Sequence, residues 1–145
     1  MRAVSILPAG TWDDAQAVDS VLLDFDLRHR RRIALRTEAG ADLLLDLAQA
    51  ARLRDGDALV LDTGGLVRVR ARPEALLEIH AHGEGALIRI AWHLGNRHLP
   101  VQVLGQRLRI RDDHVVAALV GQLGGHLARI EAPFDPEAGA YEHGH

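Results

Sequence analysis

The sequence predicts an α+β protein, in which a β-rich first half precedes a half that alternates strands and helices. Two observations support this prediction. Before residue 73 apolar residues recur mostly at every second position, whereas after it two segments show the three- and four-residue spacing of a helix. Asp-Gly and Gly-Gly pairs in the first half are typical of turns between short strands. A chain of 145 residues can form two small domains, each with a modest core.

The first half contains several predicted strands joined by turns. Residues 21–27 alternate apolar and charged side chains, as a half-buried strand does. Residues 58–61 and 66–71 form a further pair of strands around a Gly-Gly turn. Residues 54–57 form another strong turn, because Asp-Gly accommodates positive φ. We therefore predict a small antiparallel β-barrel or sandwich domain over residues 1–72.

Pro73 interrupts this alternation, and the spacing of apolar residues changes after it. Residues 76–82 are predicted to form a strand. A helix with an apolar stripe is predicted to begin at Glu84. The Gly95-Asn96 pair is predicted to end this helix. The second half therefore opens with a strand and a helix.

The rest of the second half predicts a hairpin around residue 105, a helix over residues 113–123 and a strand over residues 126–134. The complete order, β-α-β-β-α-β, is the ferredoxin-like pattern, which we predict for residues 73–134. No apolar period follows, so residues 135–145 are predicted to form a short flexible tail.

Composition narrows the class of function. The formal net charge is -3 and aromatic residues make up 3%, so neither charge nor base stacking favours nucleic acid as a partner. Cysteine is absent, which excludes thiolate nucleophiles and sulfur-ligated metal sites. No apolar run approaches the ~20 residues of a membrane span, and no apolar signal core follows Met1. A cytoplasmic location without membrane contact is therefore expected.

Nine histidines remain as the best transition-metal ligands, and all but His29 lie from His80 onward. Without cysteine, imidazole and carboxylate are the ligands available, and they suit Ni, Zn or Cu. The alternative is that the histidines are scattered over the surface of an Arg-rich protein. Their number leaves both interpretations open, so their placement has to decide.

His98 lies in a tight connection between a predicted helix end and a strand that begins at Pro100. Such a connection holds a ligand on rigid flanks. One histidine cannot form a strong metal site, but a twofold axis near this loop would bring two of them together in a homodimer. The alternative is an ordinary loop histidine that is bonded to a backbone carbonyl.

His114 lies in the first turn of the second predicted helix, where the partial positive charge disfavours imidazolium. Asp112 and Asp113 could add carboxylate oxygens, or they could cap the helix and leave His114 merely exposed. At the end of the chain, His143 and His145 could enclose an ion together with the terminal carboxylate. The glycine between them allows most backbone angles.

The other five histidines give weaker signals. His80 and His82 share one face of a predicted strand, a geometry that can chelate but that any exposed strand produces. His93 lies on the polar face of its helix and is predicted to face solvent, while His29 and His126 have no informative spacing. None of the five is therefore assigned as a ligand.

Several blocks of the sequence resemble the UreE family of urease accessory proteins. The resembling blocks are Gly95–Pro100 (Gly-Asn-Arg-His-Leu-Pro), Asp113–Val115, Pro133–Tyr141, the Arg-rich run Arg28–Arg32 and Leu53–Asp57. The resemblance extends from about Asp24 to the end of the chain.

This resemblance implies a nickel metallochaperone, without catalysis of its own, that delivers Ni²⁺ to apo-urease during assembly of the metallocentre. It implies a β-rich peptide- or partner-binding domain over residues 1–72 and a metal-binding, dimerising domain over residues 73–134. The nickel ligand at the family's dimer interface corresponds to His98, and the tail ligands correspond to His143 and His145. Zn²⁺ or Cu²⁺ is expected to replace Ni²⁺ in vitro. The implied partners are a second copy of the chain, the urease apoprotein and the accessory GTPase that assembles the metallocentre.

Two departures from the family pattern refine this expectation. Many relatives have a second histidine where this chain has Asp112, which weakens a peripheral site at His114. The long His-rich tail of some members is reduced here to two histidines, which predicts delivery of few ions rather than storage. Two other functions stay open from the residues alone. One is a protein-interaction module with incidental histidines, and the other is a metal-dependent hydrolase, for which no local spacing supplies a general base.

Overall fold

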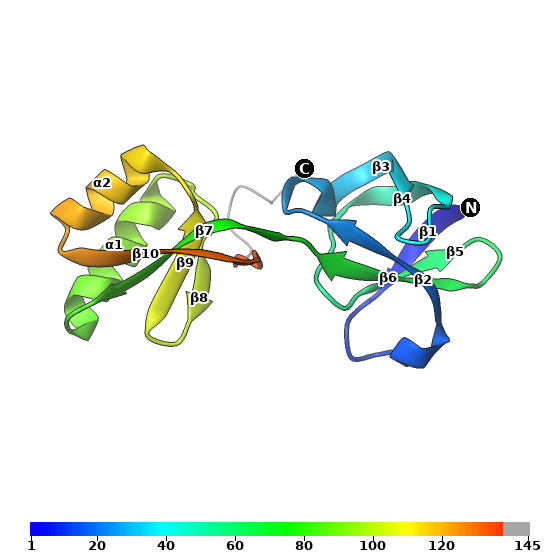
Figure 1. Cartoon of the computed structure of the whole chain (residues 1–145), viewed down its shortest axis with the longest axis horizontal. Helices are drawn as coiled ribbons and strands as arrows, with labels where there is room; N and C mark the ends of the chain where they lie inside the picture. The colour runs from blue at the N-terminus through cyan, green and yellow to red at the C-terminus, as the bar shows by residue number, and fades with distance from the viewer. Residues whose placement is uncertain (138–145) are drawn as a thin grey trace. The chain divides into compact units, whose positions relative to one another are not determined.

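The computed structural model describes residues 1–137 of the chain (Figure 1). These residues form two compact units, Met1–Arg72 and a unit that begins at Pro73. Each unit has its own sheet and its own apolar core. The predicted α+β class is confirmed. Among residues 1–137, no helix has the length and hydropathy that crossing a membrane requires.

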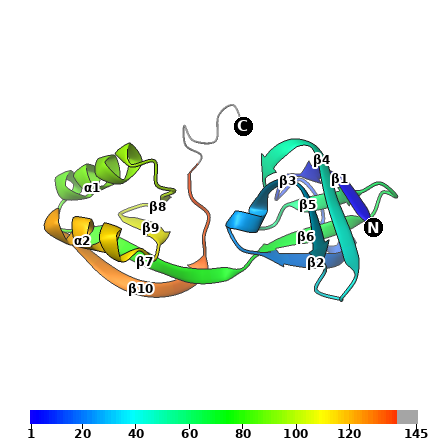
Figure 2. The ribbon, with the colours of Figure 1, turned by 90° about the horizontal axis from the view of Figure 1, so that it is seen from above.

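The first unit folds into one six-stranded, curled sheet (Figure 2). Its elements are β1 (Arg2–Leu7), η1 (Asp14–Gln16), β2 (Ala17–Leu23), η2 (Asp26–Arg28), β3 (His29–Arg36), β4 (Asp42–Arg52), β5 (Ala58–Leu61) and β6 (Leu66–Ala71). The strand order is β2-β6-β5-β1-β4-β3. Two pairs, β1 with β4 and β2 with β6, are parallel. The sheet is therefore mixed and not purely antiparallel as predicted, because alternation along a strand does not reveal the direction of its partner.

A buried carboxylate fixes the turn before β5. Asp57 is 6% exposed and accepts hydrogen bonds from the backbone N–H groups of Ala9 (2.9 Å) and Arg54 (2.8 Å). Gly56 has a φ of 88°, the positive value expected of an Asp-Gly turn. Burial of a carboxylate is costly unless it is hydrogen-bonded, and these two bonds meet that requirement.

The second unit has the β-α-β-β-α-β order that the sequence predicts. Its elements are β7 (Pro73–Ala81), α1 (Glu84–Asn96), β8 (Gln102–Leu104), β9 (Arg107–Arg111), α2 (His114–Gln122) and β10 (Gly125–Pro133). The strand order is β10-β7-β9-β8, and all of these pairs are antiparallel. Both helices lie on the same face of the sheet (Figure 2), where they bury an apolar core. The opposite face of β7 carries polar residues, among them Glu78 and His80.

β10 enters the sheet close to the helices because its first residue is glycine. A Cβ atom on Gly125 would lie 2.5 Å from Val120 Cγ1 and 2.9 Å from Ile90 Cδ1. An approach this close leaves no room for any other side chain. The resulting register with β7 places His126 opposite His80.

Candidate metal centre

His98 follows α1 in a tight C-terminal cap. Its backbone N–H donates to the carbonyl of Gly95 (3.0 Å), and the N–H of Leu99 donates to the carbonyl of Leu94 (3.3 Å). With a φ of 59° at His98, these two bonds define a Schellman motif, in which the left-handed residue is usually glycine. The helix ends at Asn96, as predicted from the Gly95-Asn96 pair, and the left-handed residue of its cap is His98.

The backbone of His98 is strained. Within residues 1–137, His98 is the only residue other than glycine with a positive φ. This conformation costs roughly 1–2 kcal/mol for a residue that has a Cβ atom. The His98 side chain is exposed and forms no hydrogen bond or ion pair with another described residue. A strained backbone that presents an unengaged imidazole indicates a functional role, and it disfavours the alternative of a loop histidine bonded to a carbonyl.

The second candidate group lies where β9 leads into α2. Asp113 is the N-cap of α2, and its carboxylate accepts hydrogen bonds from two backbone N–H groups of the first turn (2.9 and 3.2 Å). The Asp112 carboxylate pairs with Arg129 at 3.0 Å. Both carboxylates are therefore engaged in holding the fold, and His114 is exposed beside them.

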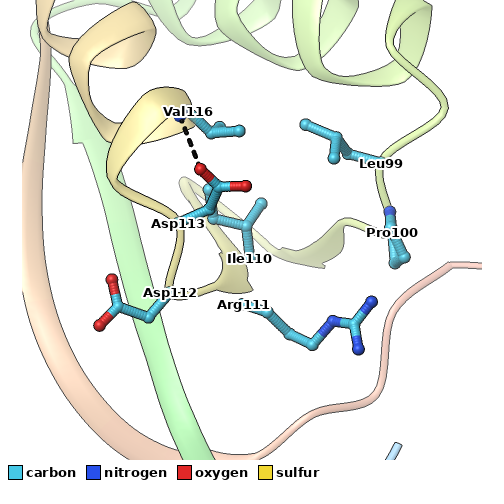
Figure 3. A pocket seen from close by; sticks show the side chains of 7 residues that line it. All are labelled: Leu99, Pro100, Ile110, Arg111, Asp112, Asp113 and Val116. Atoms are coloured by element: carbon cyan, nitrogen blue, oxygen red, sulfur yellow. Dashed lines mark hydrogen bonds between the residues drawn. The ribbon is translucent and has the colours of Figure 1, made fainter. Parts of the chain in front are cut away.

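A cavity of about 290 Å³ lies between the segment that follows His98 and the start of α2 (Figure 3). Its lining residues are Leu99, Pro100, Ile110, Arg111, Asp112, Asp113 and Val116. Figure 3 shows the Asp113 carboxylate turned back to its own helix and the Asp112 carboxylate turned away from Leu99 and Pro100. The two carboxylates in the lining therefore do not converge on one point.

Three other histidines come together where β7 ends and β10 begins. His126 lies opposite His80 with the ring centres 5.2 Å apart, and the ring centre of His82 lies 4.9 Å from that of His126. The spacing of His80 and His82 was visible in the sequence, whereas the position of His126 follows from the pairing of β10 with β7. His93, predicted to face solvent, is instead half-buried, and its ring meets Trp92 edge-on at 5.0 Å.

The open face of the second sheet also carries a paired carboxylate. Glu78 accepts hydrogen bonds from Arg107 and Arg109, at 2.9 Å each. The hydrogen bond from Arg109 holds the pKa of Glu78 below its usual range, and the hydrogen bond from Arg107 contributes less to this shift. Partial burial opposes the shift. Glu78 is therefore committed to two arginines and is not a spare metal ligand.

No three His, Asp or Glu side chains of residues 1–137 are arranged to hold a metal ion. The predicted ligands His143 and His145 lie outside the described residues. His98 can therefore supply one ligand from this part of the chain, and further ligands have to come from elsewhere. The chemistry of the donor set fits nickel, because cysteine is absent and imidazole binds Ni²⁺, Cu²⁺ and Zn²⁺ well.

Comparison with known proteins identifies the family of both units. Residues 3–72 match the N-terminal domain, and residues 74–145 the C-terminal domain, of the UreE urease accessory protein. The urease accessory protein UreE of a Bradyrhizobium species is 57% identical over 141 residues, which cover 97% of this chain and 68% of the relative. Those of Beijerinckia indica and Rhodobacter capsulatus are 52% and 43% identical, and this chain covers 81% and 88% of their lengths. A Rhodopseudomonas palustris relative is 58% identical, and this chain spans 60% of it.

These matches confirm the resemblance inferred from the His98 loop and from the segment around Pro133. They cover both units of the chain and almost its whole length. The chain therefore belongs to the UreE family of urease accessory proteins, which are nickel chaperones of urease maturation and not enzymes.

Proposed function

We propose that the chain binds Ni²⁺ between the His98 side chains of two subunits and delivers the ion to the urease apoprotein during assembly of its metallocentre. The main support is the left-handed backbone of His98, which presents an exposed imidazole at a cost to folding. Family membership supports nickel as the cargo. The absence of cysteine supports it too, because imidazole is then the strongest nickel ligand in the chain.

A homodimer would combine one His98 from each subunit into a shared metal site. α1 bears two large apolar residues on its solvent side one turn apart, Ile88 (66% exposed) and Trp92 (62% exposed). An exposed apolar stripe of this kind is typical of a packing surface. The cap of the same helix holds His98. A twofold axis that pairs α1 with its copy would therefore bring the two His98 side chains together.

The tail histidines His143 and His145 are proposed to complete the coordination of the ion. A short tether raises the effective concentration of these imidazoles near the His98 pair to the order of mM. Ligands from two subunits and a tail can exchange one at a time, unlike those of a closed structural site, and a protein that releases its cargo requires this. His114 is left out of this proposed coordination, because both neighbouring carboxylates are engaged elsewhere.

The first unit is proposed to bind partner proteins, namely the urease apoprotein and the accessory GTPase, in the cytoplasm. β3 lies at one edge of its sheet and carries the exposed residues Arg30, Arg31 and Arg32. An edge strand offers unpaired backbone groups, and its arginines would favour an acidic partner segment.

Isothermal titration of the full-length, tag-free dimer with Ni²⁺, and in parallel with Zn²⁺ and Cu²⁺, tests the metal site. We expect His98→Ala to abolish high-affinity nickel binding and to leave the dimer intact. His98→Asn is the matched variant, because asparagine tolerates the left-handed backbone better than alanine does. His114→Ala is the control and should keep its affinity. Unchanged affinity in both His98 variants would refute the site.

Sedimentation analysis tests the dimer. The double variant Ile88→Glu/Trp92→Glu should be monomeric and should lose tight nickel binding with it. Val18→Glu is the control, because Val18 is equally exposed (67%) in the first unit. A double variant that remains dimeric would place the interface elsewhere.

Two further measurements test release and delivery. Removal of residues 142–145 should speed nickel loss to a chelator in stopped-flow measurements while the His98 ion is retained. Equal release rates would mean that the tail takes no part. Nickel-loaded protein should also activate apo-urease in the presence of a chelator that blocks activation by free nickel, and the His98→Asn variant should not.

A further inference from the structure

We propose that His80, His82 and His126, here called the histidine cluster, form a second binding site for a divalent transition-metal ion. The cluster lies where β7 leads into α1 and where β10 begins, and these segments lie side by side (Figure 1). His126 is directly opposite His80 in the register, and His82 lies two residues further along the chain. The fold therefore gathers three imidazoles from two segments that are more than forty residues apart in the sequence.

The spacing of the three rings suits a shared ion. The ring centres are 5.2 Å apart for His80 and His126, and 4.9 Å apart for His82 and His126. Imidazole nitrogens bind such ions at about 2.0–2.1 Å, which places the centres of two rings on one ion roughly 5 Å apart. The paired strands therefore already hold the rings of His80 and His126 at the separation that coordination needs, and His82 follows β7 directly.

The orientation of the rings has to change when an ion binds. The planes of the His80 and His126 rings differ by 27°, so that these rings stack and do not point their nitrogens at one position. The cluster is therefore not a preformed metal site, and no other group of His, Asp or Glu side chains in residues 1–137 is one. All three side chains are exposed, and exposed side chains change rotamer within picoseconds to nanoseconds. Rotation about side-chain bonds is therefore the only rearrangement required.

The three imidazoles are not engaged by other groups. None of them forms a hydrogen bond or ion pair within residues 1–137, although each contacts another ring of the cluster. The charged residues on the same face of β7 and β9 include Glu78, Arg107 and Arg109, and Glu78 binds both arginines. The two guanidinium groups are therefore directed at a carboxylate. The ring nitrogens remain free to accept a cation.

The cluster is separate from His98. α1 lies between His82 and His98, and its 13 residues span roughly 20 Å at 1.5 Å per residue. One ion cannot be shared across this distance. The cluster is also complete within one subunit, so this inference does not rest on the proposed dimer or on nickel delivery.

Neutral imidazoles with open positions for water suit the borderline ions Ni²⁺, Cu²⁺ and Zn²⁺. Because the rings have to reorient and no carboxylate joins them, we expect the cluster to bind more weakly than the His98 site. An ion held in this way exchanges readily with solvent.

A Zn²⁺ titration of the full-length chain, followed by NMR of ¹⁵N-labelled histidine rings, tests the inference. The background is the variant His98→Asn/His143→Ala/His145→Ala, which removes the other proposed ligands without shortening the chain. We expect the ring nitrogens of the cluster to shift together and to saturate at one ion per chain. His126→Gln should weaken this binding at least roughly tenfold.

His114→Gln is the matched control, because it removes another exposed histidine and should change nothing. Thermal denaturation followed by circular dichroism checks that His126→Gln remains folded. If His126→Gln remains folded and keeps full affinity, or if only histidines outside the cluster respond to Zn²⁺, the inference is overturned. The fate of the His98 site does not alter these outcomes, because His98 is absent from the background.

Discussion

His98 and His114 lie at helix ends, and each is next in sequence to a residue that lines the same cavity, yet the chain holds them in opposite ways. His98 occupies a left-handed position that glycine would fill at lower cost. His114 follows Asp113, whose capping bonds stabilise the start of α2 by about 1 kcal/mol. A histidine close in sequence to a cavity is therefore weak evidence for a metal ligand, whereas backbone strain that the fold does not need is strong evidence.

The largest expected difference follows from replacing each histidine by glycine. His98→Gly should weaken nickel binding at least about a hundredfold (about 2.7 kcal/mol), because both copies of the ligand are lost. It should also stabilise the fold by up to about 1 kcal/mol, because glycine relieves the left-handed strain. His114→Gly should keep the affinity and lower stability by up to about 1 kcal/mol, because glycine disfavours a helix.

Nickel titration and thermal denaturation of both glycine variants measure these effects. Opposite signs of the two stability changes are the decisive result. A stability loss in His98→Gly would mean that the imidazole supports the fold. The proposed difference between His98 and His114 would then be wrong.

A smaller difference is expected between the two aspartates beside His114. Asp113→Ala should lower the free energy of unfolding by about 1 kcal/mol, because the N-cap is lost. Asp112→Asn should lower it by only a few tenths of a kcal/mol, because its partner Arg129 is 80% exposed and such pairs contribute little. Urea denaturation compares the two variants. Reduced nickel affinity in Asp112→Asn would show instead that this carboxylate is a ligand, and His114 would regain a role.

The smallest expected effect is a pH dependence, which distinguishes loss of nickel binding from loss of stability. A protonated imidazole cannot bind metal, so nickel affinity should fall as the solution is made more acidic. The hydrogen bond from Arg109 holds the pKa of Glu78 below its ordinary value of 4.5. Its contribution to stability is therefore complete above 4.5 and is lost as the pH falls through the lower pKa of the folded state.

Glu78→Gln should accordingly lower the free energy of unfolding by a few tenths of a kcal/mol at neutral pH, and this deficit should shrink in acid. Urea denaturation at a series of pH values, alongside nickel titrations at the same values, measures the pH ranges over which stability and nickel affinity are lost. Nickel affinity that persists down to the region of carboxylate titration would point to carboxylate ligands and would contradict the assignment of His98.

The topology of the second unit could be predicted from the sequence because each of its elements has a local signature. The apolar stripe after Glu84 and the aspartates before α2 lie within the segments that they specify. The first unit was less predictable. Its parallel pairs, β1 with β4 and β2 with β6, join strands that are not consecutive, and alternation within a strand contains no information on that choice.

The candidate site, too, could be predicted from the sequence only in part. His98 could be found from its place in the chain and from a family resemblance, but its left-handed backbone could not, because histidine is not a residue that normally marks such a turn. The position of His126 beside His80 depends on packing at a distance. It follows from a register that Gly125 permits by approaching Ile90 and Val120 closely.

The cap of α1 limits how a partner protein could distinguish a nickel-bound form of the chain from a nickel-free form. Its two backbone hydrogen bonds do not involve the imidazole of His98. Binding of an ion by that side chain would therefore require no change in these bonds. A partner protein that touches only this loop would meet the same backbone in both states. Discrimination between them has to come from ligands that join or leave together with the ion.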